Sequence, residues 1–116
     1  MDSADRPWGS WYVLDVGEGY KVKRIEVRPG HRLSYQTHDQ RSEHWCVVRG
    51  TATCLLDGET VVLSLGETLD VPRGAAHRIS NLHDDDLTII EIQRGTYLGE
   101  DDILRLEDDY GRDESQ

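Results

Sequence analysis

Residues 30–50 read GHRLSYQTHDQRSEHWCVVRG, and this stretch decides the fold class of the chain. Alternating side chains along 32–38 and again along 43–49 match the period of a β-strand. The polar residues 39–42 between the two segments suit a turn. The stretch therefore predicts two short strands joined by a turn.

Strand parity predicts which of these side chains share a face. Gln36 and His38 point to the same side of the first strand, because successive side chains alternate. In the second strand, Glu43 lies on the same face as Trp45, and His44 lies on the opposite face. If the strands pair around the turn, Gln36, His38 and Glu43 converge on one interior point, and His44 points away from it.

The rest of the chain repeats the pattern of short strands separated by glycine turns. Asp57-Gly58 lies between apolar flanks and predicts a tight hairpin, because both residues tolerate a positive φ. Many short strands at regular spacing are typical of an all-β sandwich or barrel. Residues 100–106 begin with acidic side chains and predict a short C-terminal helical segment. The predicted strands are 11–15, 20–28, 32–38, 43–49, 51–57, 59–63, 68–71, 77–80 and 87–93.

The predicted strand at 20–28 has an inconsistent alternation. Lys21 and Lys23 share parity with Ile25, which should face the core. Either a bulge near Arg24 resets the face, or the two lysines point inward at the mouth of the barrel. The bulge is the simpler of the two alternatives.

The composition indicates one acidic globular domain. A chain of 116 residues has room for one hydrophobic core, so we expect a single domain over residues 1–116. The net charge of −10 excludes the electrostatic attraction that nucleic-acid binding needs. Between Lys21 and Gly50, however, seven basic residues stand against three acidic ones. They could bind a small anion, although a solvated strand face explains them equally well.

The sequence also bears on cellular location. No apolar run approaches the roughly 20 residues of a membrane span, and Met1 is not followed by a signal-like segment. We therefore expect a cytoplasmic protein without a membrane partner. Cys46 and Cys54 lie symmetrically about Gly50, so a hairpin there would allow a disulfide, but two buried thiols are expected in a reducing cytosol.

Two motifs can be defined by the spacing of glycine, histidine and glutamate residues. The first contains Gly30, Gln36, His38, Glu43 and Gly50. The second contains Gly66, Pro72, Gly74, His77 and Asn81. They resemble the two motifs of the cupin superfamily, except that Gln36 stands where most members have a histidine. The resemblance implies a cupin double-stranded β-helix, or jelly-roll barrel, with its motif core at 30–81.

The resemblance to cupins also implies a metal site inside the barrel. Carried over residue by residue, the metal ligands are Gln36, His38, Glu43 and His77. Imidazole, carboxylate and amide donors suit one divalent metal ion (Zn, Mn, Co, Ni or Fe), and such a site leaves positions open for a substrate. The alternative is a set of buried polar residues that satisfy one another.

Longer segments are similar to a narrower family. RPWGSWYVLDVGEGYKVKRIEVRPG (6–30), QTHDQRSEHW (36–45), VVRGTA (47–52) and YLGEDDILRLEDDYGR (97–112) resemble the type II mannose-6-phosphate isomerase domain. That domain is usually the C-terminal part of bifunctional mannose-1-phosphate guanylyltransferase/phosphomannose isomerase enzymes. Gln36 agrees with this family, whereas Asp39 and Gln40 stand where fused relatives often have histidines. The chain has no glycine-rich phosphate loop, so transferase activity is not expected.

The family resemblance implies a metal-dependent aldose–ketose isomerase that interconverts mannose 6-phosphate and fructose 6-phosphate. Such a reaction needs an electrophile, a base and an anchor for the phosphate. Arg41 lies in the family's ligand-flanking motif and is predicted to contact the phosphate or the transition-state charge. Lys21 and Arg112 are further predicted substrate contacts. The base stays open, with Lys23 and His44 among its candidates.

Two other functions would keep the same fold. A non-catalytic cupin would hold a metal and bind a sugar or sugar phosphate without turnover. A cupin dioxygenase would use Fe(II), but the C-terminal segment and the basic residues argue against it. The face opposite the site carries the apolar residues Leu33, Tyr35, Cys46 and Val48, and this predicts a homodimer, as is common among cupins.

Overall fold

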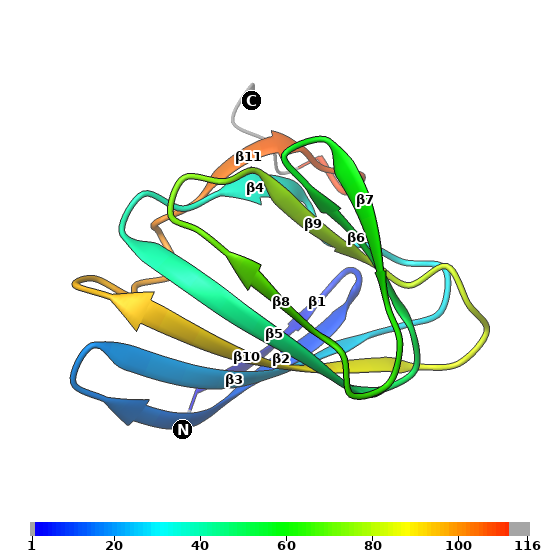
Figure 1. The fold of residues 1–116 in the computed structure, drawn as a ribbon, viewed down its shortest axis with the longest axis horizontal. Coiled ribbons are helices and arrows are strands. Elements are labelled where there is room, and N and C mark those ends of the chain that lie inside the picture. Colours follow the sequence, from blue (N-terminus) through cyan, green and yellow to red (C-terminus); the bar gives the residue numbers. More distant parts are fainter. Residues whose placement is uncertain (1, 112–116) are drawn as a thin grey trace.

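Residues 2–111, the part of the chain that the computed structural model describes, form eleven strands in two sheets and no helix. All neighbouring strands are antiparallel. The six-stranded sheet has, in spatial order, β1 (Ser3–Arg6), β2 (Gly9–Gly17), β3 (Tyr20–Val27), β10 (Leu87–Gly95), β5 (Arg41–Arg49) and β8 (Thr68–Val71). The five-stranded sheet has β11 (Leu104–Glu107), β4 (Tyr35–Thr37), β9 (His77–Ser80), β6 (Ala52–Leu56) and β7 (Glu59–Leu63). The two sheets face each other across the core, and this confirms the all-β barrel (Figure 1).

All nine predicted strands are present, and two strands were not predicted. β1 pairs with β2, and β11 pairs with β4 at the edge of the smaller sheet. The helix expected at 100–106 is wrong, because Leu104 pairs with Thr37 in that ladder. An isolated helix of seven residues has too few hydrogen bonds to be stable, whereas the open edge of β4 offers backbone partners.

The hairpin between β6 and β7 confirms the prediction from Asp57-Gly58. Both residues have left-handed backbone angles, with φ of 46° at Asp57 and 84° at Gly58. Leu56 and Glu59 pair directly across the turn. Two consecutive positive φ values suit the twist of the strands that the turn connects.

The polar residues 39–42 do not join a hairpin, contrary to the sequence-based expectation of pairing around the turn. β4 belongs to the five-stranded sheet and β5 to the six-stranded one, so the chain crosses between sheets here. The parity prediction nevertheless holds. Gln36, His38 and Glu43 are all buried, because the inner faces of both sheets look into the same barrel.

The inconsistent alternation of β3 is explained by a lysine, Lys23, that points into the barrel. The pairing of β3 with β10 runs from Val27 to Tyr20 without a register shift, so a bulge near Arg24 is wrong. The irregularity lies instead on β2, between Val13 and Asp15. Lys23 therefore keeps the inward direction of Ile25, and only 4% of its surface is exposed.

The cysteines do not form the disulfide that their spacing allows. Cys46 lies on β5 and Cys54 on β6, which belong to different sheets, so no hairpin aligns them. Both are free thiols; Cys54 is buried and Cys46 is only partly so. Among the described residues, no helix is long and apolar enough to cross a membrane.

Candidate metal centre

A cavity of about 100 Å³ lies between the two sheets. Its lining combines the predicted ligands with Arg41 and Lys23, and with the aromatic rings of Trp8, Trp11 and Trp45. The strands place most of these groups there, because Trp11, Lys23, Gln36, Arg41, Glu43, Trp45 and His77 occupy inward positions of their strands. Trp8 lies in the turn before β2, and His38 directly follows β4.

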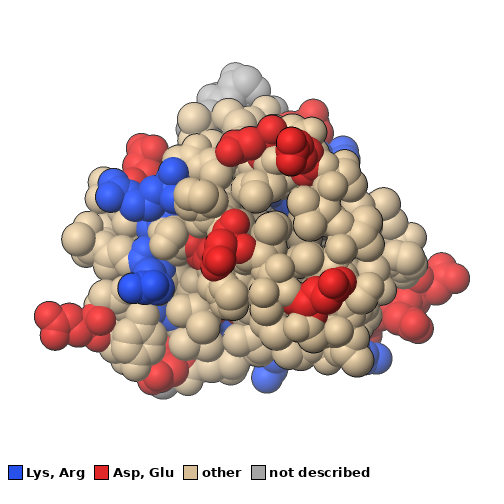
Figure 2. Space-filling model, viewed as in Figure 1, with Lys and Arg blue, Asp and Glu red and all other residues tan. Residues whose placement is uncertain are grey.

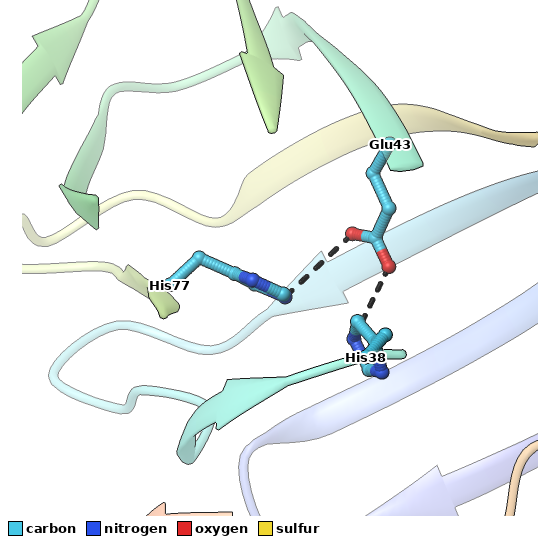
Figure 3. A group of neighbouring side chains, drawn as sticks. All are labelled: His38, Glu43 and His77. Carbon is cyan, nitrogen blue, oxygen red and sulfur yellow. Dashed lines mark ion pairs between the residues drawn. The ribbon is translucent and has the colours of Figure 1, made fainter. Parts of the chain in front are cut away.

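Three buried side chains that could bind a metal ion meet in this cavity: His38, Glu43 and His77. One potential ligand atom from each lies within 4.8 Å of the others. Nε2 of His38 is 3.2 Å from Oε2 of Glu43, and Nε2 of His77 is 3.9 Å from Oε1 of the same carboxylate. Figure 3 shows the Glu43 carboxylate between the two imidazole rings.

Hydrogen bonds to backbone carbonyls orient both imidazoles. Nδ1 of His38 lies 2.6 Å from the carbonyl oxygen of Asp102, and Nδ1 of His77 lies 3.0 Å from that of Ala75. A carbonyl oxygen can only accept a hydrogen bond, so each Nδ1 carries the proton and is the donor. Each Nε2 therefore presents a lone pair, as a metal ligand requires.

The electrostatics of the site favour neutral imidazoles. Burial, followed by the charge of Arg41, lowers the pKa of His38 to about 4. Burial also lowers the pKa of His77. Neutral imidazole is the form that binds metals, so the lowered pKa values favour the protonation state that a metal site would need at neutral pH.

Arg41 supplies a positive charge to this group of acceptors. Its Nε donates to Oε2 of Glu43 at 2.8 Å, and its Nη2 lies 3.2 Å from Nε2 of His38. The 3.9 Å between His77 and Glu43 is too long for a hydrogen bond. Two imidazole nitrogens and a carboxylate that face one another with this gap fit a divalent metal ion.

Gln36 lies beside this group and completes the predicted set. It is the cross-strand partner of His77, and it is buried. Its amide nitrogen donates to Oγ of Ser34 at 3.1 Å and lies 3.3 Å from the Ser34 carbonyl oxygen. The side-chain carbonyl oxygen is then the atom that Gln36 can offer to a metal.

The other predicted site residues lie in different places. Lys23 lines the cavity, whereas Lys21 is not among the lining residues and donates to the carbonyl oxygen of Leu98 at 2.8 Å. His44 points away, as predicted, with Nδ1 2.6 Å from Oδ1 of Asp70. Arg112 lies outside the described residues.

Two important residues of the site were missed in the sequence. Glu91 on β10 is buried against the indole nitrogen of Trp45, which donates to Glu91 at 3.1 Å and to Glu43 at 2.9 Å. Burial, followed by the charge of Glu43, raises the pKa of Glu91 to about 7. A signal was available, because Glu91 shares strand parity with the buried Leu87 and Ile89.

Glu100 is the second residue that the sequence did not single out. It lies between β10 and β11, and its carboxylate oxygens are 3.0 and 2.9 Å from Nζ of Lys23. The acidic run around it looks like a helix start or a solvated tail. Only the folded chain brings it to a lysine 77 positions earlier.

Charged side chains are unevenly distributed on the surface. Figure 2 shows Lys and Arg gathered on the side of the view where the turn between β4 and β5 and the end of β10 lie. Acidic side chains are spread over the whole of that face, including beside this group. A basic end on a chain of net charge −10 would attract a small anion locally.

Comparison with known proteins gives a family match over most of the chain. The sequence pattern of the family described as "Mannose-6-phosphate isomerase C-terminal" matches residues 2–108. The "Mannose-1-phosphate guanylyltransferase ManC" of Salmonella typhimurium is 49% identical over 107 residues, which are 92% of this chain. The chain spans only 22% of the length of that relative.

Solved structures share the fold at low sequence identity. The oxalate decarboxylase of Lactobacillus farciminis superposes with a TM-score of 0.79 at 19% identity, over 91% of this chain and 33% of that one. The Cnp3 cupin domain of Schizosaccharomyces pombe superposes with a TM-score of 0.71 at 15% identity, over 74% of this chain and 64% of that one. The barrel is therefore a cupin fold.

Proposed function

The chain belongs to the family described as "Mannose-6-phosphate isomerase C-terminal", and we propose that it interconverts mannose 6-phosphate and fructose 6-phosphate with one divalent metal ion. One observation carries the proposal. His38, Glu43 and His77 converge in a buried cavity that two cationic side chains, Lys23 and Arg41, also line. This combination suits a small anionic substrate whose oxygens need polarisation.

The metal would be held by His38, Glu43 and His77, with Gln36 as a fourth and weaker donor. When bound, it would supply a Lewis acid that polarises the carbonyl oxygen of the sugar. Trp45 holds the Glu43 carboxylate through its indole N–H, so it positions this ligand.

Arg41 and Lys23 would act on the substrate through positive charge. The Arg41 guanidinium is fixed beside the ligands by Glu43 and would stabilise negative charge that develops on the sugar oxygens. An ammonium paired with a carboxylate is a hydrogen-bond donor, so Lys23 beside Glu100 suits charge stabilisation better than the role of base. Lys21 and Arg112 remain predicted substrate contacts.

The test is a turnover assay on the metal-loaded protein. Mannose 6-phosphate is added, and fructose 6-phosphate is measured with each of the five candidate metals. His77→Ala should abolish both turnover and metal binding, because it removes a buried ligand. His44→Ala is the matched control, because the same residue type points to Asp70 and away from the cavity, and it should retain both.

A second function, binding without catalysis, is favoured by one observation. The chain corresponds to 22% of a relative that is named for guanylyltransferase activity rather than for isomerisation. Measurable binding of mannose 6-phosphate without turnover, whichever metal is loaded, would replace the isomerase with a sugar-phosphate-binding module.

We also propose that the protein acts in the cytoplasm as a homodimer. Val48 on the outer face of β5 is 47% exposed, so part of the apolar outer surface is open to a partner. The mass of the full chain in solution, measured by light scattering, tests the dimer. A monomer at micromolar concentration would contradict it.

A further inference from the structure

Three side chains form a diagonal row across the inner face of the six-stranded sheet: Arg6 on β1, Trp11 on β2 and Lys23 on β3. The register pairs Ala4 with Trp11 and Val13 with Lys23, so all three point into the barrel. The Arg6 guanidinium carbon lies 5.7 Å from the centroid of the Trp11 ring, and Nζ of Lys23 lies 4.1 Å from it. The Trp11 indole thus makes cation–π contacts with two cations.

Both cations line the same cavity as the metal ligands. Two positive charges around one aromatic ring repel each other, and a shared anion would turn that repulsion into attraction. A guanidinium and an ammonium both suit phosphate oxygens, the first through paired donors and the second as a point charge.

The Arg6 guanidinium has N–H donors available for a ligand. Its Nη1 donates to the carbonyl oxygen of Asp5 at 3.1 Å, and none of the ion pairs within residues 2–111 includes it. A guanidinium carries five N–H donors, so most of them can reach an incoming ligand. Arg41 differs, because its guanidinium is already bound to Glu43 and His38.

The ammonium of Lys23, in contrast, is already paired with a carboxylate of the same chain. Both carboxylate oxygens of Glu100 lie within 3.0 Å of its ammonium, and one of them is 3.8 Å from Lys21. The Glu100 side chain is 45% exposed, although that of Lys23 is only 5% exposed. An ion pair with one partner open to water contributes little free energy, so a better anion can replace the exposed partner.

The distance from this row to the metal ligands also fits a phosphorylated sugar. Lys23 pairs with Glu91, and Glu91 pairs with Trp45, whose indole nitrogen binds Glu43. Lys23 and Trp45 are therefore two strands apart, which corresponds to about 10 Å. This separation is comparable to the length of an open-chain hexose that carries its phosphate at the far end.

We propose that Arg6 and Lys23, on the two strands that flank the strand of Trp11, form the subsite for the substrate phosphate, and that Glu100 is the carboxylate that a bound phosphate displaces. The proposal rests on the proposed function for the identity of the sugar phosphate. The pairing of the two cations around Trp11 stands on the geometry alone. Glu100 then sets the affinity, because it competes for Lys23 with every external anion.

The experiment measures binding of inorganic phosphate and of mannose 6-phosphate to the full chain in metal-free buffer, by calorimetry at fixed low salt. Arg6→Gln should weaken the binding of both ligands about 10-fold, since one charged contact is lost. Glu100→Gln should strengthen binding several-fold, because the competing charge is gone. Arg24→Gln is the matched control; Arg24 lies beside Lys23 but on the outer face, over Tyr12, and its loss should change nothing.

Several results would overturn the subsite. They are absence of phosphate binding by the wild-type chain, equal affinity of Arg6→Gln and wild type, and weaker binding by Glu100→Gln. Arg6→Lys should recover part of the affinity, which separates loss of charge from loss of structure. Unchanged far-ultraviolet circular dichroism verifies the fold of each variant.

The same variants separate this inference from the proposed function. If the expected binding pattern appears but metal-loaded protein gives no fructose 6-phosphate, the subsite stands and the isomerase fails. If the protein turns over and Arg6→Gln leaves KM for mannose 6-phosphate unchanged, the isomerase stands and the subsite is wrong.

Discussion

The backbone carbonyl oxygen of Asp102 lies 2.6 Å from Nδ1 of His38, a residue 64 positions earlier in the chain. The Asp102 carboxylate also accepts the amide hydrogens of Asp39 and Gln40, each at 2.9 Å. The segment between β10 and β11 therefore orients His38, a predicted metal ligand, and holds the turn that follows it.

Replacement of Asp102 by alanine should weaken metal binding. The variant keeps the backbone carbonyl but loses both bonds to the turn, so the carbonyl is held less firmly against His38. Loss of such a partner lowers metal affinity by about 10-fold. Titration of the apoprotein with Zn²⁺ measures the change. Asp101→Ala is the control, because its carboxylate accepts from the Tyr97 hydroxyl, whereas the turn amides donate to Asp102. Equal losses in both variants would contradict the role of Asp102.

Replacement of Arg41 by methionine should destabilise the metal-free protein more than the metal-bound one. Arg41 and Glu43 are both buried, and removal of one partner leaves an unpaired carboxylate at a cost of about 3–5 kcal/mol. A bound metal would neutralise the same carboxylate and recover part of that loss. Thermal unfolding with chelator and with excess Zn²⁺ measures both states. The exposed Arg73→Met is the control, and a loss for Arg41→Met that is the same in both buffers would count against a metal at Glu43.

Stability of the metal-free protein should respond to pH through two opposing groups. The folded pKa of His38 is lowered from 6.5 to about 4, so the unfolded state binds more protons in this window and stability rises with pH. The folded pKa of Glu91 is raised from 4.5 to about 7, so its contribution is present at low pH and lost as pH rises. Between pH 4.5 and 6.5 the two contributions oppose each other.

The variant Glu91→Gln should reveal the contribution of the histidines, because burial lowers the pKa of His77 as well as that of His38. Its free energy of unfolding should rise by at least about 2 kcal/mol from pH 4.5 to 6.5, whereas that of the wild type should change less. Urea unfolding in the presence of chelator at the two pH values measures the difference. A wild-type slope as steep as that of the variant would rule out the opposing carboxyl.

Two glycines with similar backbone angles should differ in their tolerance of alanine. Gly30 has φ of 75° and open space around it, so Gly30→Ala should cost only the backbone strain of about 1–2 kcal/mol. Gly50 has φ of 81°, and a Cβ there would lie 2.6 Å from the carbonyl oxygen of Asp86. Gly50→Ala should therefore cost about 1–3 kcal/mol more. Urea unfolding of the two variants is the measurement, and similar losses would show that the chain relaxes around Gly50.

The sequence by itself determined the strands and the direction of their side chains. Alternation along 32–38 and 43–49 placed Gln36, His38 and Glu43 on inner faces and His44 on an outer one, and all four lie so in the structure. The Asp57-Gly58 turn was likewise readable, because the backbone angles it requires favour particular residues. These features depend on neighbours only a few residues apart.

Tertiary structure decided which distant segments meet. β4 and β5 proved to lie in opposite sheets, and 104–107 became an edge strand because β4 had an open side. The inward direction of Lys23 depended on where the bulge fell, and the pairing of Lys23 with Glu100 joins residues 77 positions apart. Local periodicity fixes the face of a side chain, but register and the order of strands fix its partners, and both result from packing of the whole barrel.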